Sequence, residues 1–234
     1  RKELEPVFDY RIIADVTDLN GETRTGETTI TVGYTSLQLQ ISLPNGELQT
    51  TKQFNNINIS TKNMMGEFVK SSVSVRMYQL NAPDRLIRDR YWEQPDQFIM
   101  NEKEYRADFP NDEYNNETEK ESWEKGKMVY EKKDSSKLSG EWSMVSGEWK
   151  TGWYLIEAST TDKDGKEVKN QTYVQLTDEK TKRLSSPEYV WQLPSTVTAE
   201  PGTSASIGIG SSASDVYVVQ IDPNSENKNP VYHQ

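Results

Sequence analysis

Residues 37–43 read LQLQISL, with an apolar residue at every second position. Because side chains alternate between the two faces of a β-strand, this spacing predicts a strand with one face in a core and the other in water. The same alternation runs through residues 10–16, 54–59 and 70–80, and helical spacing is nearly absent. We therefore expect an all-β protein. The residues expected on its inward face are Leu39, Ile41, Val73, Val75 and Ile156.

Short loops rich in Asn, Asp and Gly separate these strands. Asn20-Gly21, Pro44-Asn45-Gly46 and Asp164-Gly165 supply the left-handed backbone that tight hairpin turns need. Short strands connected in this way are typical of an antiparallel β-sandwich, in which alternate residues of each strand fill a core between two sheets. The fold class predicted from the pattern is therefore an antiparallel sandwich.

One hairpin pattern occurs twice at a constant spacing. Residues 10–21 read YRIIADVTDLNG, residues 154–165 read YLIEASTTDKDG, and each segment leads into a Thr-rich strand. Convergence of two amphipathic hairpins remains an alternative, but a true repeat would make each copy the closing hairpin of one β-domain. The matching pairs are Tyr10 and Tyr154, Ile12 and Ile156, Ala14 and Ala158, Thr17 and Thr161, Asp18 and Asp162, and Gly21 and Gly165.

Two stretches depart from the short-strand pattern. Residues 93–141 are dense in charge, and we predict an insertion there between two strands of a middle domain, with a solvated surface excursion as the plainer alternative. Residues 185–234 contain a strand, a Pro201-Gly202 turn and further strands, which we interpret as the start of another domain. The chain begins at Arg1 without an initiator methionine, so we expect a piece of a longer or processed protein.

Composition excludes several classes of function. The 234 residues include no cysteine, one histidine (His233), and 37 acidic against 27 basic residues, for a net charge of −10. The chain therefore has no thiol nucleophile, disulfide framework or Cys-ligated zinc, and one histidine gives no basis for a Ser-His-Asp triad. The acidic balance argues against a nucleic-acid partner, and no run reaches the ~18 apolar residues of a membrane-spanning helix. We expect a non-enzymatic chain with no catalytic residue, metal or cofactor.

Two local patterns suggest binding sites, and each has a plainer structural explanation. Asp162 and Asp164 alternate as at the start of a calcium loop, but no glutamate follows at the required spacing, so a hairpin turn accounts for them better. Trp142, Trp149 and Trp153 are spaced roughly along a strand face. They fit a sugar-stacking platform or, as we expect, the core of a sandwich or a domain junction.

Several short motifs, taken in order, resemble those of bacterial alpha-2-macroglobulin-family proteins, most closely the long versions of Bacteroides and its relatives. Members of that family consist of tandem macroglobulin-like domains, each a seven-stranded antiparallel sandwich. They trap proteases at the cell envelope after cleavage of an exposed bait segment. Besides the two hairpins, the motifs are Arg90-Tyr91-Trp92 with Pro95-Asp96, Phe109-Pro110 with Asp112 and Tyr114, Gly152-Trp153-Tyr154, and Glu200-Pro201-Gly202 with Gly210-Ser211-Ser212.

The resemblance implies three parts in this chain. Residues 1–33 would be the terminal hairpin of a preceding macroglobulin-like domain, residues 34–180 a whole domain with its insertion at about 93–141, and residues 185–234 the opening strands of the next. It also implies proteases and the neighbouring domains as partners, and a periplasmic or cell-surface location in a bacterium. The covalent capture of many members needs a thioester cysteine, so this chain carries no thioester.

Two functions remain open on these grounds. The first is a non-catalytic part of a protease-trapping macroglobulin, with residues 93–141 as the candidate bait region. The second is a carbohydrate-binding or adhesin-type β-sandwich at the cell surface, suggested by the tryptophans and the acidic composition. If residues 93–141 are bait-like, the first tryptic cuts should fall between Lys120 and Lys137. Such a polar stretch buries too little apolar area to offset an ordering cost of ~1–2 kcal/mol per residue.

Overall fold

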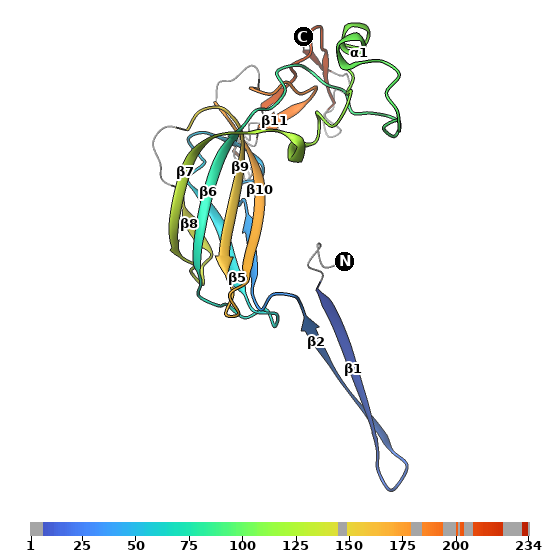
Figure 1. Ribbon diagram of the computed structural model, residues 1–234, viewed down its shortest axis with the longest axis vertical. Helices are drawn as coiled ribbons and strands as arrows, with labels where there is room; N and C mark the ends of the chain where they lie inside the picture. The colour runs from blue at the N-terminus through green and yellow to red at the C-terminus, as the bar shows by residue number, and fades with distance from the viewer. Residues whose placement is uncertain are drawn as a thin grey trace.

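The computed structural model describes residues 7–144, 149–178, 184–193, 200, 202–203, 208–221 and 231–233. It shows a β-sandwich with an N-terminal hairpin that projects from one end, while the insertion and the C-terminal strands lie at the other (Figure 1). The prediction of an all-β fold is confirmed. Within the described residues the helical structure is limited to α1 (Glu102–Asp108) and the short 3₁₀ turn η2 (Lys120–Ser122).

Two sheets form the sandwich. The smaller sheet has the order β3-β5-β8 and consists of β3 (Gln38–Ser42), β5 (Asn56–Lys62) and β8 (Glu141–Ser143). The larger sheet has the order β4-β10-β9-β6-β7 and consists of β4 (Leu48–Thr50), β10 (Glu167–Thr177), β9 (Gly152–Thr161), β6 (Ser72–Leu80) and β7 (Lys125–Ser135). Among the strands that the structure describes, β4 and β10 make the one parallel pair.

The core lies between the two sheets and is built from alternate residues of their strands. In β3 and β5 every second residue is buried, as the alternation in the sequence requires. All five residues predicted to face inward are buried, and Val73, Val75 and Ile156 have no exposed surface. Burial of one such side chain contributes about 1.5–3 kcal/mol to stability.

The predicted boundaries of the insertion are wrong at the C-terminal end. Residues 125–135 form β7, which pairs with β6, and residues 141–143 form β8, which pairs with β5. The segment between strands is instead residues 81–124. The sequence of β7, KGKMVYEKKDS, reads as polar because β7 is the edge strand of its sheet and has few inward apolar residues.

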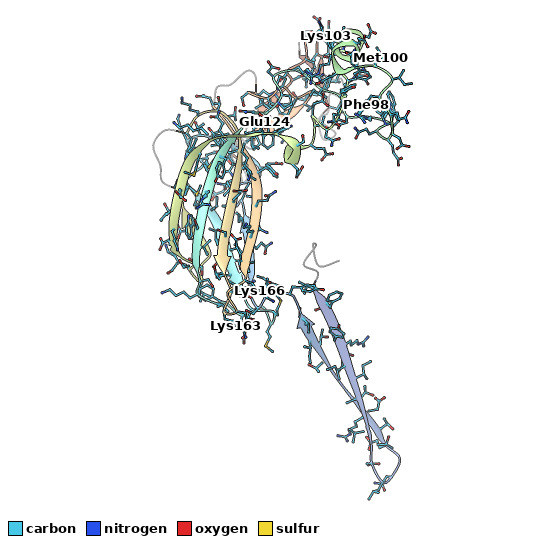
Figure 2. The ribbon with its side chains drawn as sticks, viewed as in Figure 1. Phe98, Met100, Lys103, Glu124, Lys163 and Lys166 are labelled. Atoms are coloured by element: carbon cyan, nitrogen blue, oxygen red, sulfur yellow. The ribbon has the colours of Figure 1, made fainter. Side chains whose placement is uncertain are left out.

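The N-terminal hairpin consists of β1 (Phe8–Thr17) and β2 (Thr23–Val32), which pair with each other and with no other described strand. Nearly all of its residues are exposed. Its linker to β3 is held at the tip of the β9–β10 hairpin, where Lys166 Nζ donates to the carbonyl oxygen of Tyr34 at 2.5 Å. Figure 2 shows Lys163 and Lys166 at this end of the sandwich, beside the base of the hairpin.

Two further strand pairs follow the sandwich. β11 (Trp191–Leu193) pairs with β12 (Gly208–Gly210), and β13 (Val218–Gln220) pairs with β14 (Val231–His233). Most of the chain between these strands, including Pro201 of the predicted turn, lies outside the described residues. Neither helix in the described part of the chain is long or apolar enough to cross a membrane.

Candidate functional site

Residues 81–124 form an irregular excursion, here called the β6–β7 insertion, at the end of the sandwich opposite the N-terminal hairpin. Figure 2 places Phe98, Met100 and Lys103 in its outer part and Glu124 where it returns to the sheet. Its helix α1 begins at a capping box, in which the Asn101 side chain accepts from the N–H of Glu104 and Glu104 accepts from the N–H of Asn101. The box satisfies two N–H groups that the first helical turn leaves unpaired.

Ion pairs between arginines and glutamates hold the base of the insertion. Arg85 Nη2 and Arg106 Nη2 each lie 3.2 Å from Glu117 Oε1. Arg90 Nη2 donates to three consecutive carbonyl oxygens, those of Glu113, Tyr114 and Asn115, at 3.2, 3.0 and 2.9 Å. The Arg90 side chain is only 12% exposed, so its guanidinium serves as an internal cross-link of the loop.

Glu117 is the central acceptor of this cluster. Its Oε2 accepts from the backbone N–H groups of Tyr114 and Asn115, at 3.1 and 2.6 Å. Burial alone would raise the pKa of Glu117, but the hydrogen bonds from the Asn115 N–H and Arg106, together with the charge of Arg85, outweigh it and lower that pKa below its ordinary value. The ionised carboxylate therefore stabilises the folded insertion.

Acidification should weaken the insertion through Glu117. Because its folded-state pKa is lowered, its contribution is present above the unfolded pKa of ~4.3 and is lost as the pH falls through the folded value. The amide proton shifts of Tyr114 and Asn115, followed by NMR, should titrate with a midpoint below that unfolded pKa. In Glu117→Gln this titration should vanish while the sandwich stays folded. A midpoint at or above the ordinary glutamate value would contradict the assignment.

The C-terminal end of the insertion is fixed to the outer face of the larger sheet. Trp123 packs edge-on against Trp153, with ring centroids 5.6 Å apart, and its Nε1 donates to the carbonyl oxygen of Glu117 at 2.8 Å. Lys120 Nζ lies over the Trp153 ring, 4.4 Å from its centroid, and also pairs with Glu47. These contacts anchor residues 120–123 to the sheet.

A cavity of about 540 Å³ opens between this anchored end and residues 186–192. Gln175 bridges two of its walls: in the amide orientation that satisfies both contacts, its oxygen accepts from Trp153 Nε1 and its nitrogen donates to Glu188, each at 3.1 Å. Burial raises the pKa of the Glu188 carboxyl, and the bond from Gln175 partly opposes this. Charged side chains of both signs line the cavity, so its charge selects no one class of ligand.

The tryptophans do not form a sugar-stacking platform, and the prediction that they fill the core is confirmed. Trp142 is buried in the main core, and Trp149 packs on that core with its ring edge-on to Phe54 at 5.4 Å. Trp153 is buried in a second cluster, with one ring face under Lys120. A sugar ring needs an open aromatic face, and the buried rings of Trp142 and Trp153 offer none, while Trp149 is partly buried against the core.

The aspartates of the candidate calcium loop make a turn, as expected. Asp162 Oδ1 accepts from the N–H groups of Asp164 and Lys166 at 2.9 and 2.8 Å, and its Oδ2 accepts from Ser36 N and Oγ. The lone pairs that would bind a cation are therefore used by protein donors. In the described part of the chain no group of three or more His, Cys, Asp or Glu side chains is placed to hold a metal ion.

The accessible stretch of the insertion is residues 91–99, here called the exposed segment. All nine residues are exposed and none belongs to a helix or strand. Tyr91 is 89% and Trp92 63% exposed, and Ile99 is fully exposed. The sequence prediction placed the accessible peptide between Lys120 and Lys137, which the structure instead assigns largely to the anchored end and to β7.

No protein-family model, no curated protein and no solved structure matches this chain.

Proposed function

We propose that the chain is a non-catalytic β-sandwich module of a protease-trapping protein of the alpha-2-macroglobulin kind at a bacterial cell envelope, and that residues 91–99 are its bait. The exposed segment carries the proposal. A protease binds its substrate as an extended peptide, so it needs a run of backbone that is free of hydrogen-bonded structure and accessible on both sides. All of residues 91–99 are exposed and none belongs to a helix or strand, and Gln94 Nε2 of this segment donates to Asn115 Oδ1 at 2.9 Å.

The two ends of the exposed segment are fixed, which a bait also requires. On its N-terminal side Arg90 is held by three carbonyl oxygens. On its C-terminal side Phe98 stacks on Tyr114 at 4.5 Å, and Tyr114 Oη donates to the carbonyl oxygen of Met100 at 2.9 Å. Cleavage between these anchors would break the chain without freeing either end from the sandwich.

The residues of the exposed segment select the kind of protease. Tyr91 and Trp92 suit proteases that accept a large aromatic side chain at the cleaved bond, and the segment contains no lysine or arginine. Arg90 directly precedes it, but its guanidinium is held inside the loop and is not available to a trypsin-like specificity pocket. We therefore infer that the bait is read by chymotrypsin-like proteases.

Limited proteolysis with mass spectrometry tests this proposal. Chymotrypsin should cut first after Tyr91 or Trp92, and trypsin should cut residues 90–99 at least tenfold more slowly. Replacing Tyr91 and Trp92 by serine should remove the earliest chymotryptic cuts without changing the melting temperature. Tyr10 is an internal control, because its side chain is 58% exposed but its backbone is paired in β1.

Two results separate a bait from an ordinary flexible loop. After cleavage, the pieces should elute as one particle, because β6 and β7, on either side of the cut, remain hydrogen-bonded. Chymotrypsin should co-elute with the cleaved chain when this module is expressed within the protein that it comes from. First cuts within residues 62–90 or near Lys180 would show that the exposed segment is protected, and the bait assignment would then be dropped.

A further inference from the structure

The N-terminal hairpin has two chemically different faces, and both are exposed. One face is polar and internally paired: Arg11 Nε lies 2.5 Å from Glu27 Oε1, and Thr25 and Thr31 donate to Asp15 and Asp9 at 2.6 Å each. The other face is apolar, because the residues that pair across the strands there are mostly hydrophobic. Its apolar members are Phe8, Tyr10, Ile12, Ala14, Val16, Ile30 and Val32.

A two-stranded hairpin with a bare apolar face is marginal in water on its own. Soluble proteins rarely leave such a continuous patch uncovered unless it is an interaction surface. Here Tyr10, Ile12 and Ile30 are 58%, 46% and 49% exposed. The apolar face therefore requires a cover that the described residues do not supply.

The same molecule shows what covers a face of this kind. Adding 144 to a residue number in β1–β2, starting from Phe8, gives the corresponding residue of β9–β10, starting from Gly152. The strand pairing keeps the same register, because Tyr10 pairs with Ile30 and, correspondingly, Tyr154 pairs with Val174. The apolar face of β1–β2 therefore corresponds to the inward face of β9–β10. There Tyr154, Ile156 and Val174 are at most 1% exposed, beneath the smaller sheet.

The turns agree as well, although they alone would prove little. Asp18 Oδ1 accepts from the N–H groups of Asn20 and Glu22 at 2.9 Å each, as Asp162 Oδ1 does from Asp164 and Lys166. A turn of the same type also occurs at Asn63, where the flanking strands do not resemble β1 and β2. The correspondence is therefore established by the strands, and the turn is consistent with it.

One atom of the turn distinguishes the covered copy from the uncovered one. Asp162 Oδ2 accepts from Ser36 N at 3.0 Å and from Ser36 Oγ at 3.1 Å, which ties the start of the sandwich to its closing hairpin. Among the described residues, the hydrogen bonds to Asp18 come from its own turn. The N-terminal hairpin thus has the geometry of β9–β10, but no other strands of a sandwich pack against it in the described part of the chain.

We propose that β1–β2 is the closing hairpin of a second β-sandwich and that the occupant of its apolar face is a sandwich body that lacks its last two strands. That body would place a strand like β6 antiparallel to β1, a strand like β4 parallel to β2, and a smaller sheet over Tyr10, Ile12 and Ile30. The interface is the one that β9–β10 already makes in this chain. A second copy of the chain fits less well, because its own β9–β10 already fills the equivalent position.

A fusion tests the proposal, with residues 34–151 joined in front of Phe8 in place of residues 1–7. The added segment supplies the strands of the sandwich that precede β9–β10. In the fusion Thr151 is joined directly to Phe8, which takes the place that Gly152 has in the natural sequence. Arg24 would stand where Val168 is buried at the edge of the core, next to the turn, so its long apolar stem would have to lie on the core while its guanidinium extends to water. Hydrogen exchange of the β1 amides that point away from β2 should slow at least tenfold relative to the unfused chain.

Ile12→Asp and Ile13→Asp form a matched pair, because these neighbours are similarly exposed but lie on opposite faces of β1. In the fusion, Ile12→Asp should abolish the added protection and Ile13→Asp should keep it. In the unfused chain, both should leave the melting temperature of the sandwich unchanged. Hairpin amides that stay unprotected in the fusion, with the original sandwich intact, would overturn the proposal. So would a dimer of the unfused chain that Ile12→Asp dissociates, which would make the face an interface between copies.

Discussion

Val75→Asp should unfold the sandwich. Val75 lies in the middle of β6, between β7 and β9, and has no exposed surface. The substitution removes a buried apolar side chain and places a carboxylate within the main core. A cost of about 4–5 kcal/mol is expected, which is most of the stability of a domain at the lower end of the usual ~5–15 kcal/mol. Thermal unfolding followed by circular dichroism measures it.

Ser74→Asp is the matched control for Val75→Asp. Ser74 is the adjacent residue of β6, faces outward, and stands opposite Lys133 of β7. A carboxylate there remains in water beside a cation, so a change within about 0.5 kcal/mol is expected. If Val75→Asp melted at the wild-type temperature, the assignment of the inward face would be wrong.

Asp162→Ala should lower the melting temperature by several degrees and loosen the linker to the N-terminal hairpin. The carboxylate accepts four hydrogen bonds, two within its turn and two from Ser36. The hydrogen bond from the Ser36 N–H is the chief reason that the pKa of Asp162 is lowered. The stabilisation is therefore present above the unfolded aspartate pKa of ~3.9 and is lost as the pH falls through the folded value.

Asp18→Ala separates the two roles of this aspartate. It removes the same turn interactions from the first hairpin, where the structure shows no counterpart of Ser36. The melting temperature of the sandwich should therefore stay at the wild-type value, and the difference between the two variants should shrink as the pH falls through the lowered pKa of Asp162. Equal losses in both variants would mean that Ser36 contributes nothing and that only the turn matters.

The parts of the fold that were predicted from the sequence are those in which alternation reflects burial on one side. β3, β6 and β9 lie inside their sheets or against the core, so their inward residues had to be apolar. β7 was missed because an edge strand tolerates lysines along most of its length, and charge at an edge discourages pairing with other chains.

The insertion was less predictable, although one signal was overlooked. Asn101 followed by Glu104 is a capping-box sequence and indicates the start of α1. The position of the exposed segment had no comparable signal. Its exposure depends on how the neighbouring arginines hydrogen-bond to the rest of the loop, as Arg90 does to three carbonyl oxygens. These contacts are a consequence of tertiary packing rather than of local sequence.

The place of β10 between β4 and β9 has a consequence for how the sandwich is synthesised. Leu48 of β4 pairs with Gln175 of β10, so β4 cannot form its parallel pairing until β10, the last strand of the sandwich, has been synthesised. During translation, the inner faces of β3, β5 and β6 stay uncovered until β9 and β10 leave the ribosome. Such distant pairings make folding slow. The half-built sandwich is therefore the stage at which this chain is most exposed to aggregation and most in need of a chaperone.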